Sequence, residues 1–270
     1  MRKTIIYYIL VIILLGTLIS GCNKKGDKGD SNKKNIIIGC DIGCSPLVND
    51  LIKDFSLNNK TNIKQEYLSL SQGLDKLKSK KLDMYIGYTG IEDKSIKKSI
   101  IAYDGIAIIV NKNNQVNTIS IEQLNKIYSG SITEWKEINA GQEKILPISY
   151  ESSMDFNTLG LNQFLNNPIK ETLTSNSVIV SDILGAKEKV ASLSNCIAFV
   201  PGMYVENDTK TLLLNGIVLK NDSLSNDLYP LKNSINSYYL EKNENYKSIL
   251  EYIKSEDGKK IIKKHCSSIK

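Results

Sequence analysis

Residues 100–138 read IIAYDGIAIIVNKNNQVNTISIEQLNKIYSGSITEWKEI. Residues 106–110, IAIIV, are apolar without alternation, and polar residues flank them on both sides. This pattern predicts a strand that is buried on both faces, for which we expect parallel neighbours. Ser120 then precedes a helical stripe of apolar residues in 121–128, which ends before Gly130, so Ser120 is the predicted N-cap. The stretch predicts a strand, a loop and a short helix.

Two similar patterns come earlier in the chain. Residues 35–39 form a buried-strand run, and Ser45-Pro46 then begins an apolar helical stripe, with Ser45 as the expected cap. Residues 63–68 and 82–87 are strand patterns on either side of a helix pattern at 74–80. A strand-helix-strand unit favours a right-handed parallel crossover. Each helix start offers unpaired backbone N–H groups, which suit an anion.

The first 34 residues predict export and anchoring. Residues 1–21 resemble a signal peptide, with Arg2 and Lys3 ahead of an apolar run that is shorter than the roughly 20 residues of a spanning helix. The sequence ISGC at 19–22 resembles a bacterial lipobox, so we expect a lipidated Cys22 and a flexible tether over 22–34. The protein would then be held at the extracytoplasmic face of the cell membrane. The alternative is a plain membrane anchor with an accidental cysteine.

The net charge gives no support for nucleic-acid binding. The chain has 270 residues and a formal charge of +6, but the leader carries +2 of it and the tether +3. The folded body therefore carries about +1, so we expect no nucleic-acid partner.

The cysteines and the single histidine predict neither a metal site nor a cofactor. His265 stands beside Cys266, and the spacings fit no structural zinc pattern. Cys40 and Cys44 either bridge each other or remain free and buried, and the sequence leaves the state of Cys196 and Cys266 open as well. No nucleophile-base set or paired carboxylates indicate catalysis, so we expect a protein that is not an enzyme.

The opening stretch resembles the phosphate-binding components of bacterial ABC importers, a type II periplasmic-binding-protein group. The resemblance is carried by DGIA at 104–107, VN at 110–111, EQL at 122–124, IYSG at 127–130, IT at 132–133 and Trp135. It continues at 193–201, LSNCIAFVP, and in a closing helix expected at 246–264. The resemblance therefore covers nearly the whole mature chain.

The resemblance implies an α/β fold of two lobes, each a mostly parallel sheet flanked by helices, with the ligand in a cleft between the lobes. Residues 35–105 and 200–270 would form lobe one, and residues 106–199 would form lobe two. A helix is also expected at 159–166.

The family's ligand loops are only partly retained. The implied ligand-binding residues are Ser45, Ser71, Thr89, Tyr150, Ser152 and Ser153. Tyr150 stands where the family has arginine, and Arg2 is the only arginine of the chain, so a mature protein that has lost its signal peptide has no guanidinium to clamp an oxyanion.

The implied function is that of a monomeric solute-binding lipoprotein of an ABC importer. It would bind inorganic phosphate or a related small anion and deliver it to permease subunits in the membrane. Two alternatives stay open: the same fold with another anion or a small organic solute as its ligand, and a surface scaffold lipoprotein that binds no ligand.

Overall fold

The computed structural model describes residues 35–59, 61–88, 93–151 and 174–269. The segment Asn35–Lys270 is one compact unit. The signal peptide, tether and lipid anchor predicted within 1–34 lie outside the described residues, as do Thr89, Ser152, Ser153 and the helix expected at 159–166. No helix in the described ranges is long and apolar enough to cross a membrane.

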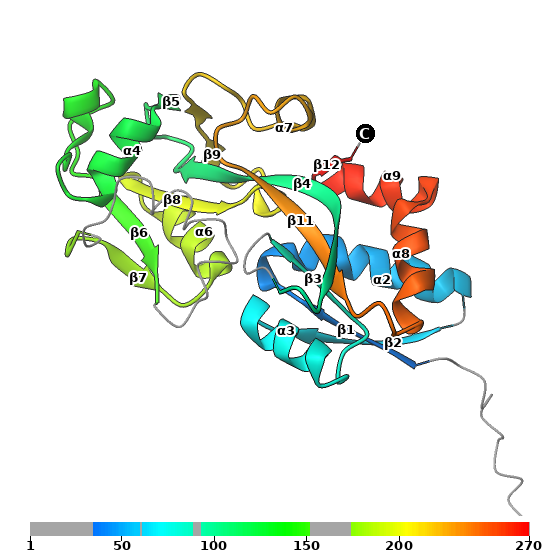
Figure 1. Cartoon of the computed structure of the whole chain (residues 1–270). Helices are drawn as coiled ribbons and strands as arrows, with labels where there is room; N and C mark the ends of the chain where they lie inside the picture. The colour runs from blue at the N-terminus through cyan, green and yellow to red at the C-terminus, as the bar shows by residue number, and fades with distance from the viewer. Residues whose placement is uncertain (1–34, 60, 89–92, 152–173, 270) are drawn as a thin grey trace, which may run out of the picture. The chain divides into compact units, whose positions relative to one another are not determined.

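Within the described residues, ten strands form one sheet, whose main path has the order β2-β1-β3-β11-β4-β8-β6-β7. These strands are β1 (Asn35–Cys40), β2 (Asn62–Tyr67), β3 (Met84–Tyr88), β4 (Lys97–Val110), β6 (Leu146–Tyr150), β7 (Val178–Val180), β8 (Cys196–Pro201) and β11 (Lys232–Tyr239). The short strands β9 (Lys210–Thr211) and β12 (Ser267–Ser268) also pair with β4, while β5 (Thr118–Ile119) and β10 (Leu213–Leu214) form a separate pair. Figure 1 shows β4 and β11 side by side, with β1–β3 on one side of them and β6–β8 on the other.

The two ends of the sheet are parallel. Strand β1 pairs in parallel with β2 and β3, so that Cys40 lies opposite Tyr67 and Ile86. Strand β6 likewise pairs in parallel with β7 and β8. The predicted parallel strand-helix-strand unit is confirmed, and the carboxyl ends of β1, β2 and β3 share one edge of the sheet, where open α/β sheets bind ligands.

Strand β4 contains the buried strand predicted at 106–110, but its main neighbours are antiparallel. Residues 106–110 are at most 4% exposed. They pair antiparallel with β8, while the first half of β4 pairs antiparallel with β11. The expectation of a parallel sheet around this strand was therefore wrong. An apolar run reports burial on both faces and carries no information on the direction of the neighbours.

Helices flank both ends of the sheet. They are α2 (Ser45–Asn59), α3 (Leu70–Lys78), α4 (Ile121–Tyr128), α6 (Ile183–Ser192), α7 (Asn221–Ser225), α8 (Asn245–Lys254) and α9 (Glu256–His265), with 3₁₀ turns η1 (Ile42–Cys44), η2 (Trp135–Ile138) and η3 (Gly202–Tyr204). Helix α4 has its predicted bounds and its predicted cap Ser120. The prediction of a single closing helix was wrong. Ser255 ends α8 and then caps α9, because its hydroxyl accepts a hydrogen bond from the Gly258 amide.

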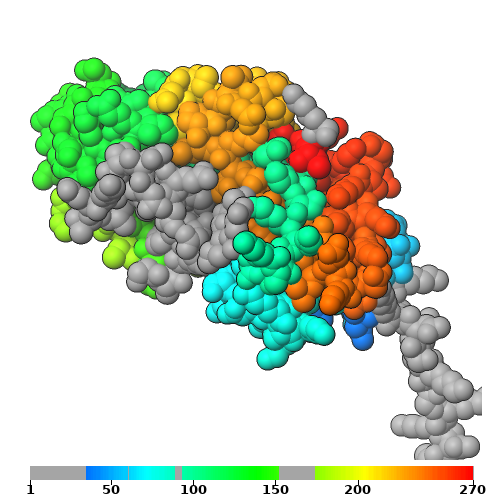
Figure 2. Space-filling model, viewed as in Figure 1, coloured from blue at the N-terminus to red at the C-terminus, as the bar shows by residue number. Residues whose placement is uncertain are grey.

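Two large apolar clusters stabilise the two ends of the sheet. One surrounds residues 106–110 and includes α4 and α6, and the other packs α2, α8 and α9 against β1, β3 and β11. Early and late parts of the chain also lie side by side at the surface. Figure 2 shows orange segments from late in the chain beside cyan and green segments from its first half. The end of the sheet that carries β1–β3 is thus completed by the last part of the chain.

The described cysteines are buried thiols without disulfides: Cys40, Cys44, Cys196 and Cys266. Burial raises the pKa of Cys40 to about 12 and that of Cys196 to about 11. Because thiolates are the reactive form, these side chains act as small apolar groups of the core.

Candidate ligand-binding site

The first loop of the site follows β1. Asp41 is fully buried, and its Oδ1 accepts a hydrogen bond from the Gly43 amide at 2.7 Å, which caps the turn η1. Helix α2 then begins at Ser45 itself. The prediction of Ser45 as the cap was wrong by one turn, because the carboxylate of Asp41 takes the capping role first. Ser45 is instead the first helical residue, at the edge of the sheet where β1 ends.

The Ser45 side chain is held by a residue from far along the chain. Ser45 is only 8% exposed, and its hydroxyl lies 2.9 Å from the hydroxyl of Tyr204 in η3. The Tyr204 hydroxyl also donates to the carbonyl oxygen of Ile42 at 2.6 Å. The turn after β8 is therefore fastened to the first loop.

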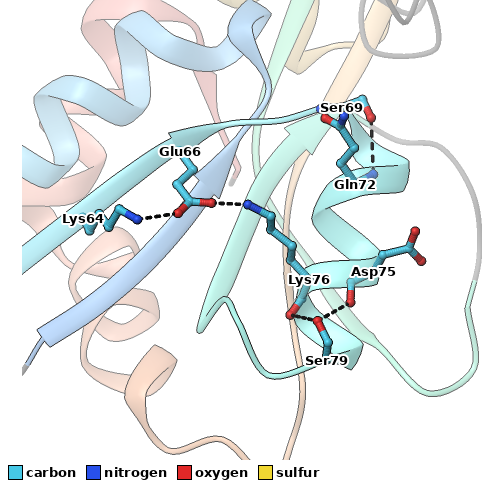
Figure 3. A network of polar contacts seen from close by, with 7 residues as sticks. All are labelled: Lys64, Glu66, Ser69, Gln72, Asp75, Lys76 and Ser79. Carbon is cyan, nitrogen blue, oxygen red and sulfur yellow. Dashed lines mark hydrogen bonds and ion pairs between the residues drawn. The ribbon is translucent and has the colours of Figure 1, made fainter.

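The second helix start lies at the carboxyl end of β2. Ser69 and Gln72 form a capping box, in which the Ser69 hydroxyl accepts from the Gln72 amide and the Gln72 side chain accepts from the Ser69 amide (Figure 3). Ser71 lies in the first turn of α3 and is exposed. In the same region Glu66 pairs with Lys64 at 2.8 Å and with Lys76 at 2.5 Å (Figure 3). The capping box fixes where α3 begins, and the Glu66–Lys76 pair ties the last turn of α3 to β2.

Helix α3 approaches the sheet closely because Gly73 faces a buried aromatic ring. A Cβ atom on Gly73 would stand 2.3 Å from the Tyr85 ring, which is fully buried. The Tyr85 hydroxyl in turn donates to the carbonyl oxygen of Leu68, just ahead of the helix, at 3.0 Å. Tyr85 thus holds the start of α3 at the sheet edge through two contacts, its ring against Gly73 and its hydroxyl bonded to the Leu68 carbonyl oxygen.

Replacing Ser69 by Ala is expected to destabilise the protein by about 1 kcal/mol, the usual cost of losing an N-cap hydroxyl. Thermal unfolding should show a melting temperature lower by roughly 2–4 °C. Ser71→Ala, two positions along the same turn, is the control and should change the free energy of unfolding by less than about 0.5 kcal/mol. Equal losses in both variants would contradict the assignment of the cap to Ser69.

A buried carboxylate joins three elements at this edge. Asp104 in β4 is 1% exposed. Its Oδ2 accepts from the hydroxyl of Tyr88 at 2.8 Å and its Oδ1 from the amide of Gly105 at 2.8 Å. The amides of Gly202 and Met203 in η3 also donate to it. Asp104 thus ties the end of β3, strand β4 and the turn after β8 together.

Tyr150 lies at the carboxyl end of β6, at the other end of the sheet. Its side chain is 3% exposed, its ring packs against Phe199 and its hydroxyl donates to the Phe199 carbonyl oxygen at 2.7 Å. Burial raises the pKa of Tyr150, so the hydroxyl stays protonated. The hydroxyls of Ser45 and Tyr150 have different partners in the described part of the chain, where β8 and η3 connect the two.

The site combines main-chain donors with acidic side chains. The start of α3 supplies amides, whereas at the start of α2 the Ser45 amide donates to the Ile42 carbonyl oxygen and Pro46 has no N–H. Asp41 and Asp104 supply two buried carboxylates. Burial raises the pKa of Asp104 to about 6, and the hydrogen bonds from Tyr88 and from backbone amides act in the opposite direction. Both carboxylates raise the pKa of the neighbouring Cys44 thiol, although burial has the larger effect. This chemistry suits binding through hydrogen bonds.

Comparison with known proteins identifies the family. A model of the PBP superfamily domain matches residues 26–254. The chain belongs to the PBP superfamily.

Relatives of this PBP superfamily chain are named for phosphate. The phosphate-binding protein PstS of Borreliella burgdorferi is 25% identical over 246 residues, which cover 88% of this chain and 83% of the relative. A crystal structure from Clostridium perfringens, with bound phosphate and assigned to phosphate ABC transport, has a TM-score of 0.79 and 25% identity over 88% of this chain and all of that one. An ABC-type phosphate transport receptor from Vibrio cholerae has a TM-score of 0.73 at 20% identity, over 88% of this chain and all of that one, and shows the fold alone.

A separate cavity of the PBP superfamily chain lies away from these residues. Its volume is about 460 Å³, and Leu146, Pro147 and Asn195 line it together with Ile127 and Thr133. Leu146 begins β6 and Asn195 immediately precedes β8, whereas the helix starts described above stand at carboxyl ends of strands. The cavity therefore does not belong to the candidate site.

Sequence reasoning missed three residues of the site. They are Asp104, Asp41 and Tyr204. An acid directly beside a buried apolar run could have indicated the two aspartates. Nothing in the sequence near Tyr204 indicates its contact with Ser45, because the two residues are 159 positions apart.

Proposed function

We propose that this chain is the solute-binding lipoprotein of an ABC importer and that it binds inorganic phosphate. The observation that carries the proposal is the start of α3, with the exposed Ser71 in its first turn, at the same edge of the sheet as the start of α2 in a member of the PBP superfamily. Amides at helix starts bind oxyanions without a side-chain cation. The names of the relatives support phosphate as the ligand.

In this proposal Ser45, Ser71 and Tyr150 belong to the ligand site together with Thr89, Ser152 and Ser153. Ser71 is the best placed of the described hydroxyls, because it is exposed in the first turn of α3. The two lobes, 35–105 with 200–270 and 106–199, would close on the ligand, and a permease would recognise the closed state. Lipid attached to Cys22 would hold the protein, as a monomer, at the extracytoplasmic face of the cell membrane. No step in this role requires catalysis.

A second candidate is a binding protein of the same fold with a changed ligand. Two buried carboxylates, Asp41 and Asp104, stand near the helix starts, and the only arginine of the chain, Arg2, lies in the predicted signal peptide. Carboxylates repel a fully ionised oxyanion and accept hydrogen bonds from a ligand that carries donors. This observation favours a protonated anion or a small organic solute over a fully ionised one.

Isothermal titration of residues 23–270 with inorganic phosphate should show saturable binding. Ser71→Ala should weaken the affinity roughly tenfold or more, since a hydrogen bond to a charged group contributes about 1.5–3 kcal/mol. Ser79→Ala at the opposite end of α3 is the matched control and should leave the affinity unchanged. A flat trace with phosphate and heat from another solute would replace the first candidate by the second.

A further inference from the structure

Tyr204 reaches the first loop from the turn that follows β8. It is the last residue of η3, and its hydroxyl contacts two groups of the first loop, the Ile42 carbonyl oxygen at 2.6 Å and the Ser45 hydroxyl at 2.9 Å. Asp104 holds the same turn from the other side, through the amides of Gly202 and Met203. The Tyr204 hydroxyl is therefore positioned by a fixed turn.

The direction of both hydrogen bonds follows from counting protons. A phenol has one O–H, and a carbonyl oxygen can only accept. Tyr204 therefore donates to Ile42, and Ser45 must donate its own single O–H to Tyr204. Burial raises the pKa of Tyr204 to about 12, so the phenol keeps its proton at neutral pH.

Ser45 consequently presents only lone pairs to a ligand. An oxyanion needs donors, so the Ser45 hydroxyl cannot bind it while its O–H donates to Tyr204. We propose that Tyr204 is a positioning residue that lowers the affinity of the first loop for phosphate by accepting the hydrogen bond of the Ser45 hydroxyl. Binding through Ser45 then requires the contact with Tyr204 to break. This inference rests on the proposed function, because it assumes that phosphate binds beside the start of α2.

Tyr204→Phe removes the acceptor and leaves the ring in place. The freed Ser45 hydroxyl can then donate to phosphate, while the carbonyl oxygen of Ile42, a residue that is 42% exposed, can bond to water. We expect the affinity for phosphate to rise roughly 3–10-fold, the range expected from one additional hydrogen bond. Tyr239→Phe in β11, which removes a phenol that stacks on Tyr246, is the matched control and should leave the affinity unchanged.

A double-mutant cycle tests whether the gain passes through Ser45. Introduced into the Tyr204→Phe variant, Ser45→Ala should cancel the whole gain in phosphate affinity. A merely structural role of Tyr204 would give the same effect with and without Ser45. A loss of affinity in Tyr204→Phe, or an equal gain in the Ser45→Ala background, would overturn the inference.

Thermal unfolding without phosphate gives a second readout. Ser45→Ala and Tyr204→Phe should show non-additive changes in the free energy of unfolding, because each removes one half of the same hydrogen bond. Additive changes would refute the contact itself. If the wild-type protein bound no phosphate, both the proposed function and the effect of Tyr204 on phosphate affinity would be wrong. If it bound phosphate but Ser45 and Tyr204 showed no coupling, only the inference about Tyr204 would be wrong.

Discussion

Replacing Asp104 by Asn should abolish a loss of stability that the wild-type protein undergoes between about pH 4 and pH 6. In the folded protein the pKa of Asp104 is raised from 3.8 to about 6, chiefly by burial. Between these two values the folded state binds a proton that the unfolded state has already released. Stability from this group is therefore complete below about pH 4 and is lost as the pH rises through about 6. Asn cannot ionise, so the variant should show no such loss.

The surroundings of Asp104 explain why its charge is costly. The residue opposite it in β11 is the neutral Asn233, which is also buried. Asp104 interacts electrostatically with four ionisable side chains and raises the pKa of each: Tyr88, Cys44, Cys266 and Tyr229. Asp41 also raises the pKa of Cys44. All of them are neutral or acidic. Hydrogen bonds offset part of the cost of burial, but no cation in this set does.

The expected size of the effect follows from the shift. About two pKa units correspond to about 3 kcal/mol, so the free energy of unfolding of Asp104→Asn, relative to wild type, should rise by about this amount from pH 4 to pH 7. At pH 4 the variant should be less stable by about 1–2 kcal/mol, because an amide brings one more N–H than a protonated carboxyl into a group of donors.

Urea unfolding at a series of pH values measures this difference directly. Asp222→Asn is the control, since the Asp222 side chain is 82% exposed and its replacement should leave the pH profile unchanged. Parallel profiles of wild type and Asp104→Asn would show that the carboxylate ionises as easily in the folded protein as in the unfolded chain. Burial of Asp104 would then carry no free-energy cost for its charge.

The sequence predicted local features of this fold well. Ser120 with Gln123 is a complete capping box within four residues, and helix α4 has the bounds that its apolar stripe indicated. Residues 106–110 are buried as their composition requires. The direction of the neighbouring strands could not be derived, because pairing with β8 and β11 joins residues far apart in the chain.

The candidate site was less predictable for the same reason. Ser45 and Ser71 could be placed near helix starts from local signals alone, although Ser69 and Asp41 have the capping roles. The partner of the Ser45 hydroxyl and two of the donors to Asp104 come from η3, far from either residue in the sequence. Side chains whose role depends on such distant partners cannot be recognised from one sequence. The local sequence predicts only that a buried polar group has a hydrogen-bond partner, and it does not identify that partner.

Gly202→Ala should have the other large effect, because this glycine leaves space for the carboxylate of Asp104. A Cβ atom on Gly202 would stand 2.6 Å from Asp104 Oδ1 and 3.0 Å from the carbonyl oxygen of Gly105. The turn η3 must then move away from β4, which weakens the amide-carboxylate contacts and shifts Tyr204 relative to Ile42. Overpacking together with a weakened hydrogen bond to a charged group should cost about 3 kcal/mol.

Gly185→Ala in helix α6 is the matched control for this variant. A Cβ atom there would meet its nearest neighbour, Asp182 Oδ1, at 3.3 Å, and Ala favours the helix, so its effect should stay below about 1 kcal/mol. In an Asp104→Ala background the cost of Gly202→Ala should shrink, because the carboxylate that the new methyl group strikes is absent. An unchanged cost in that background would place the clash on the two other neighbours of the new methyl group, the Gly105 carbonyl oxygen and the Leu219 side chain, both at 3.0 Å. The carboxylate would then not be the group that sets the distance between η3 and β4.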